Sequence, residues 1–266
     1  MSVLIAIPAR FASQRYPGKP LVPLTGATGE RRSLIERTWR AAQDLDGDAR
    51  IVVATDDDRI RTAAEAFGAE VVMTPETCAN GTERCAAAHA ALGHGYDIVV
   101  NLQGDAPLTP PWFLTALIDA MRANPAVEMS TPVLRCDGRM LDSLKADRRA
   151  GRVGGTTAVF DRQGHALYFS KEVIPYTAAD FGETAQTPVY HHVGAYAYRA
   201  DALTAYANWP EGTLEKLEGL EQLRFVEAGA RVLCVEVDGR GRPFWELNNP
   251  EDVPKIEAMM ASLDMT

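Results

Sequence analysis

The feature of this sequence that most constrains its fold is a series of short apolar runs separated by helical or polar stretches. The runs cover residues 3–7, 50–55, 70–73, 98–102 and 128–133. Each has the length of one strand, and uninterrupted apolar character is typical of strands buried on both faces of a parallel sheet. The pattern therefore predicts an α/β fold with a mostly parallel central sheet.

Helix signals lie between these runs. Ser33 and Glu36 have the spacing of a capping box in front of an amphipathic stretch. Residues 57–67 form another helical stretch, which is followed by Gly68. Thr109 precedes two prolines, which predicts a helix with a hydroxyl cap and prolines in its first turn. Such helices are the usual connections between neighbouring parallel strands.

The pattern changes after residue 133. Strand-like runs outside the parallel series cover residues 156–160, 166–169 and 191–198. They predict an antiparallel lobe over roughly residues 135–200. The later elements are helical runs near 201–208 and 214–228, a strand at 231–237 and a last helix opened by Asn249-Pro-Glu-Asp252. Because no repeat or low-complexity linker interrupts the chain, we expect one domain, residues 1–266, that carries the lobe.

Composition narrows the possible partners. The chain has 266 residues, of which 46% are hydrophobic, so it can bury a sizeable core. A formal net charge of -9 argues against general affinity for nucleic acid or anionic membranes. The N-terminus has no basic leader, no apolar run approaches roughly 18 residues, and the four cysteines lack CxxC spacing. We therefore expect a cytoplasmic protein in which any anion meets a local basic cluster.

The turn after the first run contains such a cluster. Ligands of open α/β sheets bind beyond the carboxyl ends of the strands. Here Arg10, Arg15 and Lys19 fall within ten residues, on a backbone that includes Gly18. Cations and exposed amides of this kind suit a triphosphate, and a solvated basic loop is the alternative. Neither GxxxxGK[ST] nor GxGxxG is present, which disfavours a Rossmann oxidoreductase.

A second candidate segment, Asn101-Leu-Gln-Gly-Asp-Ala-Pro107, carries Asp105 out of a buried strand through a glycine. A carboxylate in this position can hold Mg²⁺, which typically takes one or two carboxylates together with substrate phosphates. Asp105 could instead cap a turn or the helix that follows. The segment therefore indicates a Mg²⁺ site only in combination with the basic loop, which would bind the phosphates.

A third segment, Asn80-Gly-Thr-Glu-Arg84, lies in the turn before a helix. Its small residues allow a ligand to come close to the backbone, so main-chain amides could form hydrogen bonds with the ring of a base. The alternative is a capped helix start with Glu83 and Arg84 in solvent. Polar groups suited to a hydroxyl-rich ligand follow later, although each could equally be a lobe residue or a solvated helix face: Lys171, His191, His192, Glu215, Glu218, Glu221 and Gln222.

Seven segments in order resemble the 3-deoxy-manno-octulosonate (Kdo) cytidylyltransferase family. They are IPARFASQRYPGKPL at 7–21, ATDD at 54–57, NGTER at 80–84, NLQGDAP at 101–107, ALYFSKEVIPY at 166–176, HHVGAYAYR at 191–199 and LEKLEGLEQLR at 214–224. The resemblance implies a Rossmann-like nucleotidyltransferase fold and a homodimer formed through the antiparallel lobe. It also implies Mg²⁺-dependent transfer of CMP from CTP to an acidic sugar, in lipopolysaccharide or capsule polysaccharide biosynthesis.

The resemblance also implies residue roles. Catalysis is expected of Arg10, Arg15, Lys19 and Asp105. The nucleotide site matches Ala9, Arg10, Ser13, Lys19, Asn80, Gly81, Thr82, Gln103 and Asp105. The sugar acid matches Lys171, His192, Glu215, Glu221 and Gln222. The metal positions are Asp105 and Asn248.

Three positions depart from the family pattern: Ala106, Thr157 and Asn248. Thr157 stands where the family has a lysine, and Asn248 stands where a second metal-binding carboxylate is expected. A neutral amide lacks the charge of a carboxylate, so a second Mg²⁺ should bind less tightly there unless Glu246 or Asp252 compensates. A different acceptor therefore stays open, such as a nonulosonic acid, an amino-sugar variant of Kdo or a sugar phosphate. So does a non-catalytic CTP-binding homologue.

Overall fold

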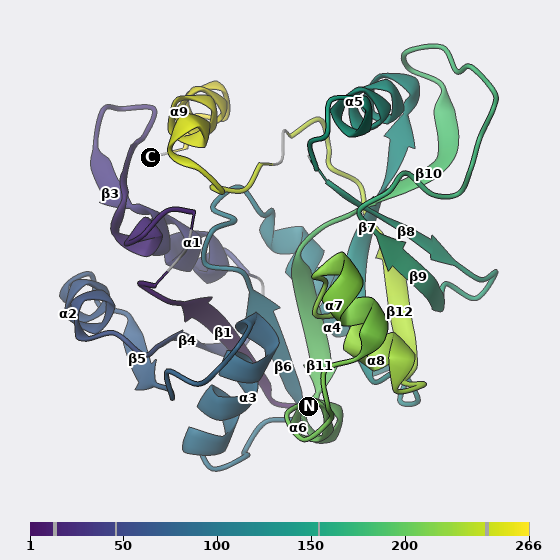
Figure 1. The fold of residues 1–266 in the computed structure, drawn as a ribbon. Helices are drawn as coiled ribbons and strands as arrows, with labels where there is room; N and C mark the ends of the chain where they lie inside the picture. Colours follow the sequence, from purple (N-terminus) through teal and green to yellow (C-terminus); the bar gives the residue numbers. More distant parts are fainter. Residues whose placement is uncertain (13–14, 46, 154, 243–244, 266) are drawn as a thin grey trace.

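The computed structural model of this protein describes residues 1–12, 15–45, 47–153, 155–242 and 245–265. A ten-stranded sheet has the order β5-β4-β1-β6-β11-β7-β10-β8-β9, with β12 paired to β7 (Figure 1). Its parallel strands are β5 (Glu70–Met73), β4 (Ala49–Thr55), β1 (Val3–Ala9), β6 (Ile98–Leu102), β7 (Met129–Asp137) and β12 (Val232–Glu236). The predicted α/β fold and mostly parallel central sheet are confirmed.

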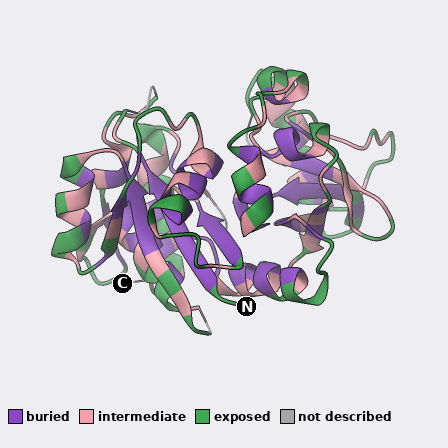
Figure 2. Ribbon diagram, turned by 90° about the horizontal axis from the view of Figure 1, so that it is seen from below, coloured by how far each residue is buried: buried purple, intermediate pink, exposed green. Residues whose placement is uncertain are grey.

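Two of the parallel strands, β1 and β6, are buried along their whole length, as their continuous apolar character predicts, whereas the edge strand β5 is exposed at both ends. In β1, Ile5 and Ile7 face a core shared with α1 (Leu34–Gln43), α2 (Asp58–Ala66) and α4 (Pro111–Ala123). Leu4 faces the opposite core, which includes α3 (Gly81–Ala91), α6 (Ala200–Tyr206) and α8 (Leu223–Glu227). Figure 2 shows the buried strands flanked by helices that are buried on one side and exposed on the other. The two layers of helices hold the strand ends in fixed positions.

The predicted antiparallel strands continue the same sheet. The second half of β7 pairs with β10 (Gln186–His192), followed by β8 (Thr156–Phe160) and β9 (Ala166–Ser170). The predicted strand at 191–198 is wrong as a single element, because the chain leaves β10 at His192 and re-enters the sheet as β11 (Ala195–Arg199). β11 lies antiparallel between β6 and β7 in the central part. The division into one domain with a lobe stays a prediction.

Two helical predictions also need correction. The run at 214–228 is two helices, α7 (Thr213–Glu218) and α8, because the chain turns at Gly219, whose φ is +61°. Such a left-handed conformation suits glycine and ends α7. Thr109 does not cap α4, since Pro110 is the N-cap residue and makes no side-chain cap hydrogen bond. By contrast, the Ser33 hydroxyl accepts from the Glu36 N–H at 3.3 Å, as predicted.

Several elements were not predicted. They are the short helix η1 (Lys19–Leu21), the hairpin β2 (Pro23–Thr25) and β3 (Arg31–Ser33), and α5 (Gly138–Arg149). The C-terminal η2 (Pro250–Asp252) and α9 (Val253–Ser262) follow the predicted opening, and Leu24 packs with Leu247 and Ile256 beside the hairpin. Within the described ranges, every helix is too short or too polar to cross a membrane.

Candidate functional site

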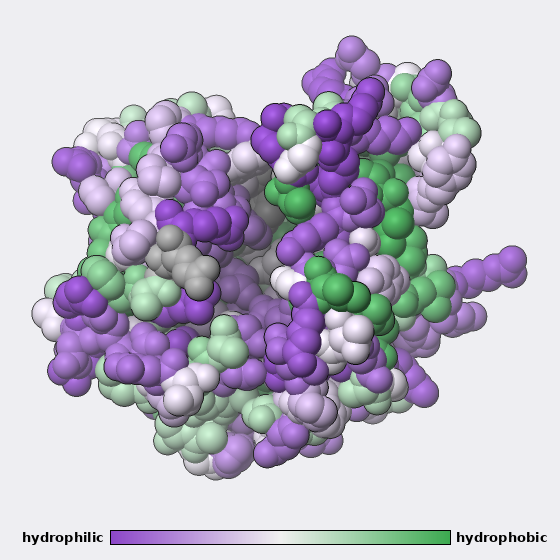
Figure 3. Space-filling model, viewed as in Figure 1, coloured by the Kyte–Doolittle hydropathy of each residue, from purple (hydrophilic) through white to green (hydrophobic). Residues whose placement is uncertain are grey.

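The candidate site lies between the two halves of the molecule. The space-filling view is hollowed between the half that carries α1 to α3 and the half that carries α5 and α7 (Figure 3). The loop after β1, the turn after β6, the start of α3, the α7–α8 region and the segment before η2 contribute polar side chains there. This is the carboxyl edge of the parallel strands, where ligands of open α/β sheets bind.

The loop after β1 folds back on itself around Phe11. The Gly18 N–H donates to the Phe11 carbonyl at 2.9 Å, and a Cβ at Gly18 would come within 3.1 Å of the Phe11 ring. The Arg59 guanidinium also lies over this ring, 3.3 Å from its centroid. Gly18 also has a φ of +72°, so glycine suits both the turn and the contact.

The returning loop brings Lys19 to Asp105. The Lys19 Nζ lies 2.5 Å from the Asp105 Oδ2, and both side chains are largely shielded from solvent. Gly104 lets the turn after β6 pack closely against β1, because a Cβ at this position would come within 2.7 Å of the Pro8 carbonyl oxygen. Two segments singled out separately in the sequence therefore meet as one ion pair.

Not every predicted residue of the basic loop contacts the carboxyl edge of the sheet. Ala9 is buried as the last residue of β1, and Arg10 is exposed with no interaction recorded among the described residues. Ser13 lies outside the described residues. The Arg15 guanidinium donates to the Asn248 Oδ1 at 3.0 Å. The loop thus keeps one cation in solvent and directs two toward the carboxyl edge.

The segment before η2 runs alongside the turn that holds Asp105. The Leu247 N–H donates to the Asp105 carbonyl at 2.9 Å. Burial and the Asp105 charge raise the pKa of Glu246 to about 7, while Lys19 and Arg15 oppose this shift. Glu246 is therefore the carboxylate next to Asp105, a neighbour that the sequence offered only as one of two alternatives.

The start of α3 is a capped helix terminus, as the structural alternative proposed. The Asn80 Oδ1 accepts from the Glu83 N–H at 2.8 Å, and the Glu83 carboxylate accepts from the Ala79 N–H at 2.8 Å. Arg84, however, is buried rather than solvated, and it donates to Asp56 at 2.8 Å and to the Thr74 hydroxyl at 2.6 Å. Arg84 thereby ties α3 to the turns after β4 and β5.

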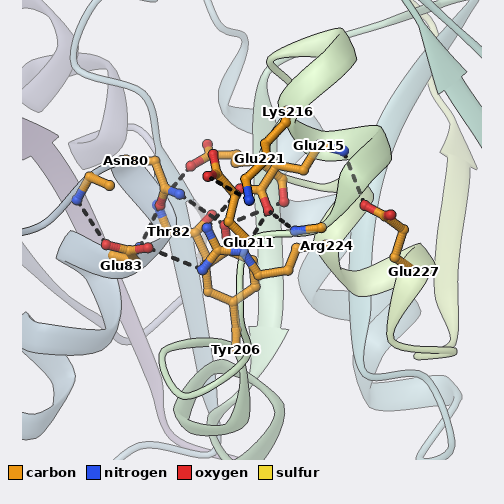
Figure 4. Close-up of polar contacts among 12 residues, drawn as sticks. Asn80, Thr82, Glu83, Tyr206, Glu211, Glu215, Lys216, Glu221, Arg224 and Glu227 are labelled. Atoms are coloured by element: carbon orange, nitrogen blue, oxygen red, sulfur yellow. Dashed lines mark hydrogen bonds and ion pairs between the residues drawn. The ribbon is translucent and has the colours of Figure 1, made fainter.

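Glu221 occupies the donors at this helix start (Figure 4). Its carboxylate accepts from the Thr82 N–H at 3.0 Å and from the Gln103 amide at 3.0 Å. Burial raises the pKa of Glu221, while the hydrogen bonds from Thr82 and Gln103 lower it. Gly81 leaves room for this meeting, because a Cβ there would lie 3.0 Å from the Gln103 Nε2. Residues expected at the base and residues expected at the sugar therefore touch.

Glu215 is committed to the protein interior. Both of its carboxylate oxygens accept from Arg224, each at 2.7 Å, and Glu215 is 4% exposed. Arg224 also donates to Glu83 at 3.1 Å and lies over the Tyr206 ring, 4.2 Å from its centroid (Figure 4). The sequence did not single out Arg224 or Tyr206. The LEKLEGLEQLR segment contains both Arg224 and Glu215, but the two lie nine residues apart and no local pattern indicates that they pair.

The other predicted sugar residues differ in accessibility. Lys171 is half-buried, and its Nζ lies 3.0 Å from the position a Cβ would take at Gly219. His192 is 6% exposed, with its Nε2 2.8 Å from the Thr131 hydroxyl, and burial lowers its pKa to about 3. The Gln222 Oε1 accepts from the Tyr196 hydroxyl at 3.3 Å, while its buried Nε2 has no hydrogen-bond partner among the described residues. Gln222 therefore offers an unused donor.

Two of the departing positions are internal. Ala106 is fully buried, so it presents no polar group. Thr157 is also fully buried, and its hydroxyl donates to the Glu172 carbonyl at 2.6 Å and accepts from the Ile174 N–H at 3.2 Å. Thr157 thus anchors the chain that follows β9.

Known proteins resemble this chain in both sequence and architecture. The sequence model of the cytidylyltransferase family matches residues 4–232. A 3-deoxy-manno-octulosonate cytidylyltransferase from Maricaulis maris is 43% identical over 98% of both chains. An 8-amino-3,8-dideoxy-manno-octulosonate cytidylyltransferase from Shewanella frigidimarina is 39% identical over 98% of this chain and 99% of its own.

A solved structure of CMP:2-keto-3-deoxy-manno-octonic acid synthetase, complexed with CTP, has the same fold. It superposes with a TM-score of 0.83 at 33% identity, covering 99% of this chain and 100% of that chain. These matches extend over both the basic loop and the α7–α8 region, so the resemblance read from the sequence is confirmed. The chain belongs to the cytidylyltransferase family.

Proposed function

We propose that this protein transfers the cytidylyl group of CTP to the anomeric hydroxyl of Kdo or a close 3-deoxy-ulosonic acid. The hydroxyl oxygen attacks the α-phosphorus and its proton passes to water. The bond from that phosphorus to the α–β bridging oxygen breaks, and pyrophosphate leaves with that oxygen. The observation that carries the proposal is the 2.5 Å contact between Lys19 and Asp105 at the ends of β1 and β6. The names of the relatives support the choice of CTP and acceptor.

The cations of the basic loop stabilise charge on the leaving group in this proposal. Arg10 is exposed beside the carboxyl edge, and Arg15 and Lys19 already point toward it. Cations that are already in position before the reaction stabilise the charge that develops on the pyrophosphate, and they need not move during the reaction. The residues contribute position and charge, and no covalent intermediate on the protein is needed.

The start of α3 holds the cytidine. The Thr82 N–H and the Gln103 amide are the donors available to a base, with Asn80 and Gly81 beside them. Since Glu221 accepts from both donors, bound cytidine and Glu221 would compete for them unless the carboxylate moves. Glu221, Gln222 and Lys171 then face the sugar acid, while Glu215 supports them through Arg224.

Nucleotidyltransferases of this kind generally use a divalent metal, and we propose Mg²⁺ here. Asp105 fits this role, because its oxygen already holds the Lys19 ammonium and hard carboxylate oxygens are preferred ligands of Mg²⁺. In the described part of the chain, no three His, Cys, Asp or Glu side chains form a metal-binding group by themselves. When bound, the ion polarises the phosphate oxygens.

Pyrophosphate release tests this function. The purified protein is assayed with CTP and Mg²⁺, with Kdo, 8-amino-3,8-dideoxy-Kdo or a nonulosonic acid as acceptor and with UTP as the control nucleotide. We expect release with CTP and an octulosonic acid. The amino sugar is the second candidate, because the Shewanella frigidimarina relative is named for it. CTP binding by calorimetry without release for any acceptor would instead identify a non-catalytic homologue.

Two further proposals concern the whole protein. We propose a homodimer formed through the antiparallel lobe, because the exposed apolar residues Val153, Leu167 and Tyr176 lie there. Figure 3 shows hydrophobic surface over the β8–β9 region. We also propose a cytoplasmic location, where CTP is available to the enzyme.

A further inference from the structure

We propose that Glu246 is the second carboxylate of the divalent-cation site, beside Asp105, and that Asn248 positions it rather than binding the cation. This inference rests on the proposed function and concerns the metal site within it. The resemblance to the family implies that the second position is Asn248, with Glu246 or Asp252 as residues that could compensate for its missing charge. The contacts of these three side chains distinguish between them.

Asn248 is held between two other side chains. Its Oδ1 accepts from the Arg15 guanidinium at 3.0 Å, and its amide donates to the Glu246 carboxylate. The only oxygen that the amide could offer a cation is thus directed at a guanidinium. A neutral amide also suits this bridge, because it can accept from Arg15 and donate to Glu246 at the same time.

Asp252 is used to cap the C-terminal helical turn. Its Oδ2 accepts from the Asn248 N–H at 3.0 Å and from the Asn249 N–H at 2.7 Å, while its Oδ1 accepts from the Trp245 Nε1 at 2.9 Å. Both oxygens are therefore occupied by the backbone and the indole of its own segment. Moving this carboxylate to a cation would uncap η2.

Glu246 faces the turn that carries Asp105. Leu247 is fully buried and donates its N–H to the Asp105 carbonyl, which aligns the two segments. The Glu246 Oε1 lies 3.0 Å from the position of a Cβ at Gly194, and the Gln103 side chain lies 3.9 Å from the same position. Gly194 has no side chain, and this leaves room for the Glu246 carboxylate. The carboxylate therefore lies near Gln103, a residue assigned to the nucleotide site that follows β6.

The chemistry of this group suits a hard divalent cation. Asp105 and Glu246 supply carboxylate oxygens, and a bound triphosphate supplies more oxygens, which is the usual ligand set of Mg²⁺. Lys19 and Arg15 lie on the same side and partly balance the two negative charges. A divalent ion between the carboxylates takes over part of that balance.

Binding of Mn²⁺ tests the inference without relying on turnover. Free Mn²⁺ is titrated by electron paramagnetic resonance against the full-length protein in the presence of CTP and absence of acceptor. We expect Glu246→Gln to weaken Mn²⁺ binding about tenfold or more, within the range measured when groups that support a metal site are removed. The matched control is Glu251→Gln, which removes the same charge from an exposed position of the same segment and should leave Mn²⁺ affinity unchanged.

Further variants separate the possible failures. Glu246→Asp keeps the charge with a shorter reach and should bind Mn²⁺ with intermediate affinity; it is also the variant to use if Glu246→Gln does not melt cooperatively. Wild-type Mn²⁺ affinity in folded Glu246→Gln overturns the inference, as does a larger loss in Asn248→Ala than in Glu246→Gln. Asp105→Asn serves as the reference for a lost ligand. If pyrophosphate release persists while Glu246→Gln binds Mn²⁺ normally, the proposed reaction stands and only this inference fails.

Discussion

Glu215 and Arg224 form the most deeply buried ion pair of the candidate site. Both side chains are nearly inaccessible, at 5% and 6% exposure, and the pair is bidentate. Bidentate guanidinium–carboxylate pairs are geometrically specific, and a charge left without its partner in the interior is costly. The pair therefore fixes α7 against α8 around Gly219.

Removal of the Glu215 charge should consequently destabilise the protein. We expect Glu215→Gln to lower the free energy of unfolding by about 3–5 kcal/mol, because Arg224 stays buried with an incomplete partner. The matched control is Glu211→Gln, whose carboxylate lies 3.7 Å from the exposed Lys216 and should contribute about 0–1 kcal/mol. Urea unfolding of the two variants measures the difference. Equal stability of both would mean that Glu215 is free to serve as a ligand.

His191 and His192 should make the protein less stable in mild acid. Burial lowers the pKa of His191 to about 4 and that of His192 to about 3, so both are neutral in the folded protein at neutral pH. Between these values and the ordinary pKa of about 6.5, the unfolded chain binds more protons than the folded protein. Above the ordinary pKa, the two buried histidines do not lower the free energy of unfolding. Below it, the free energy of unfolding falls by about 1.4 kcal/mol per pH unit for each histidine.

His192→Gln isolates one of these contributions. Glutamine can still donate to the Thr131 hydroxyl but does not titrate, so the loss of stability from pH 6.5 to 4.5 should be about 1.4 kcal/mol per unit smaller than in the wild type. The half-exposed His165 provides the control as His165→Gln. Urea unfolding at several pH values gives the slopes, and identical slopes for His192→Gln and wild type would contradict the assignment.

At the scale of elements, local pattern predicted the strands better than the connections between them. β5, β6 and β8 have the predicted bounds, because each is a short apolar or β-branched run in the sequence, although only β6 of the three is buried throughout. The break between α7 and α8 was missed although Gly219 marks it, because the residues on both sides of this glycine have helical composition. The Glu215–Arg224 pair is formed across the turn. The position of β11 depends on pairing with β6 and β7, which no local pattern reports.

The candidate site was predictable to a similar extent. Lys19 and Asp105 follow strands, so the rule for parallel sheets brought them to one edge. The contact of Arg224 with Glu83 and the position of Glu246 near Asp105 were harder to predict, because each joins residues more than a hundred positions apart in sequence. Contacts of this kind are fixed by the tertiary fold and leave no periodic signal in the chain.

The cap at the start of α3 provides a prediction at this scale. Asn80 caps α3 and also donates to the Tyr206 hydroxyl at 2.9 Å, so it joins the helix to α6. Asn80→Ala should lower the free energy of unfolding by about 1 kcal/mol, the usual effect of losing such a cap. Asn80→Asp keeps an acceptor for the Glu83 N–H and should lose less. Chemical denaturation distinguishes the two, and equal losses would assign the effect to the Tyr206 contact instead.

At the scale of the whole molecule, one continuous sheet joins the two halves around the site. β11 connects them by pairing with β6 on one side and β7 on the other. Side chains far apart in the chain meet across the carboxyl edge, as in the contacts of Arg15 with Asn248 and of Gln103 with Glu221. The site therefore requires the complete fold, including the C-terminal segment.

The antiparallel end of this sheet carries the surface proposed for dimerisation. Leu167 is 60% exposed on β9 and Tyr176 is 88% exposed in the chain that follows. Exposed apolar surface marks interaction sites, and a symmetric dimer would bury the same surface of both copies.

Sedimentation equilibrium measures the outcome directly. The wild type should have twice the chain mass of 28.9 kDa, and Leu167→Glu combined with Tyr176→Glu should shift it toward 28.9 kDa, because dimerisation would bury the introduced charges. Leu217→Glu is the matched control, since Leu217 is 78% exposed on α7 outside the lobe and its replacement should leave the mass unchanged. A wild type that sediments as a monomer at micromolar concentration would refute the dimer. If the double variant is still a dimer, the interface does not include the β9 surface.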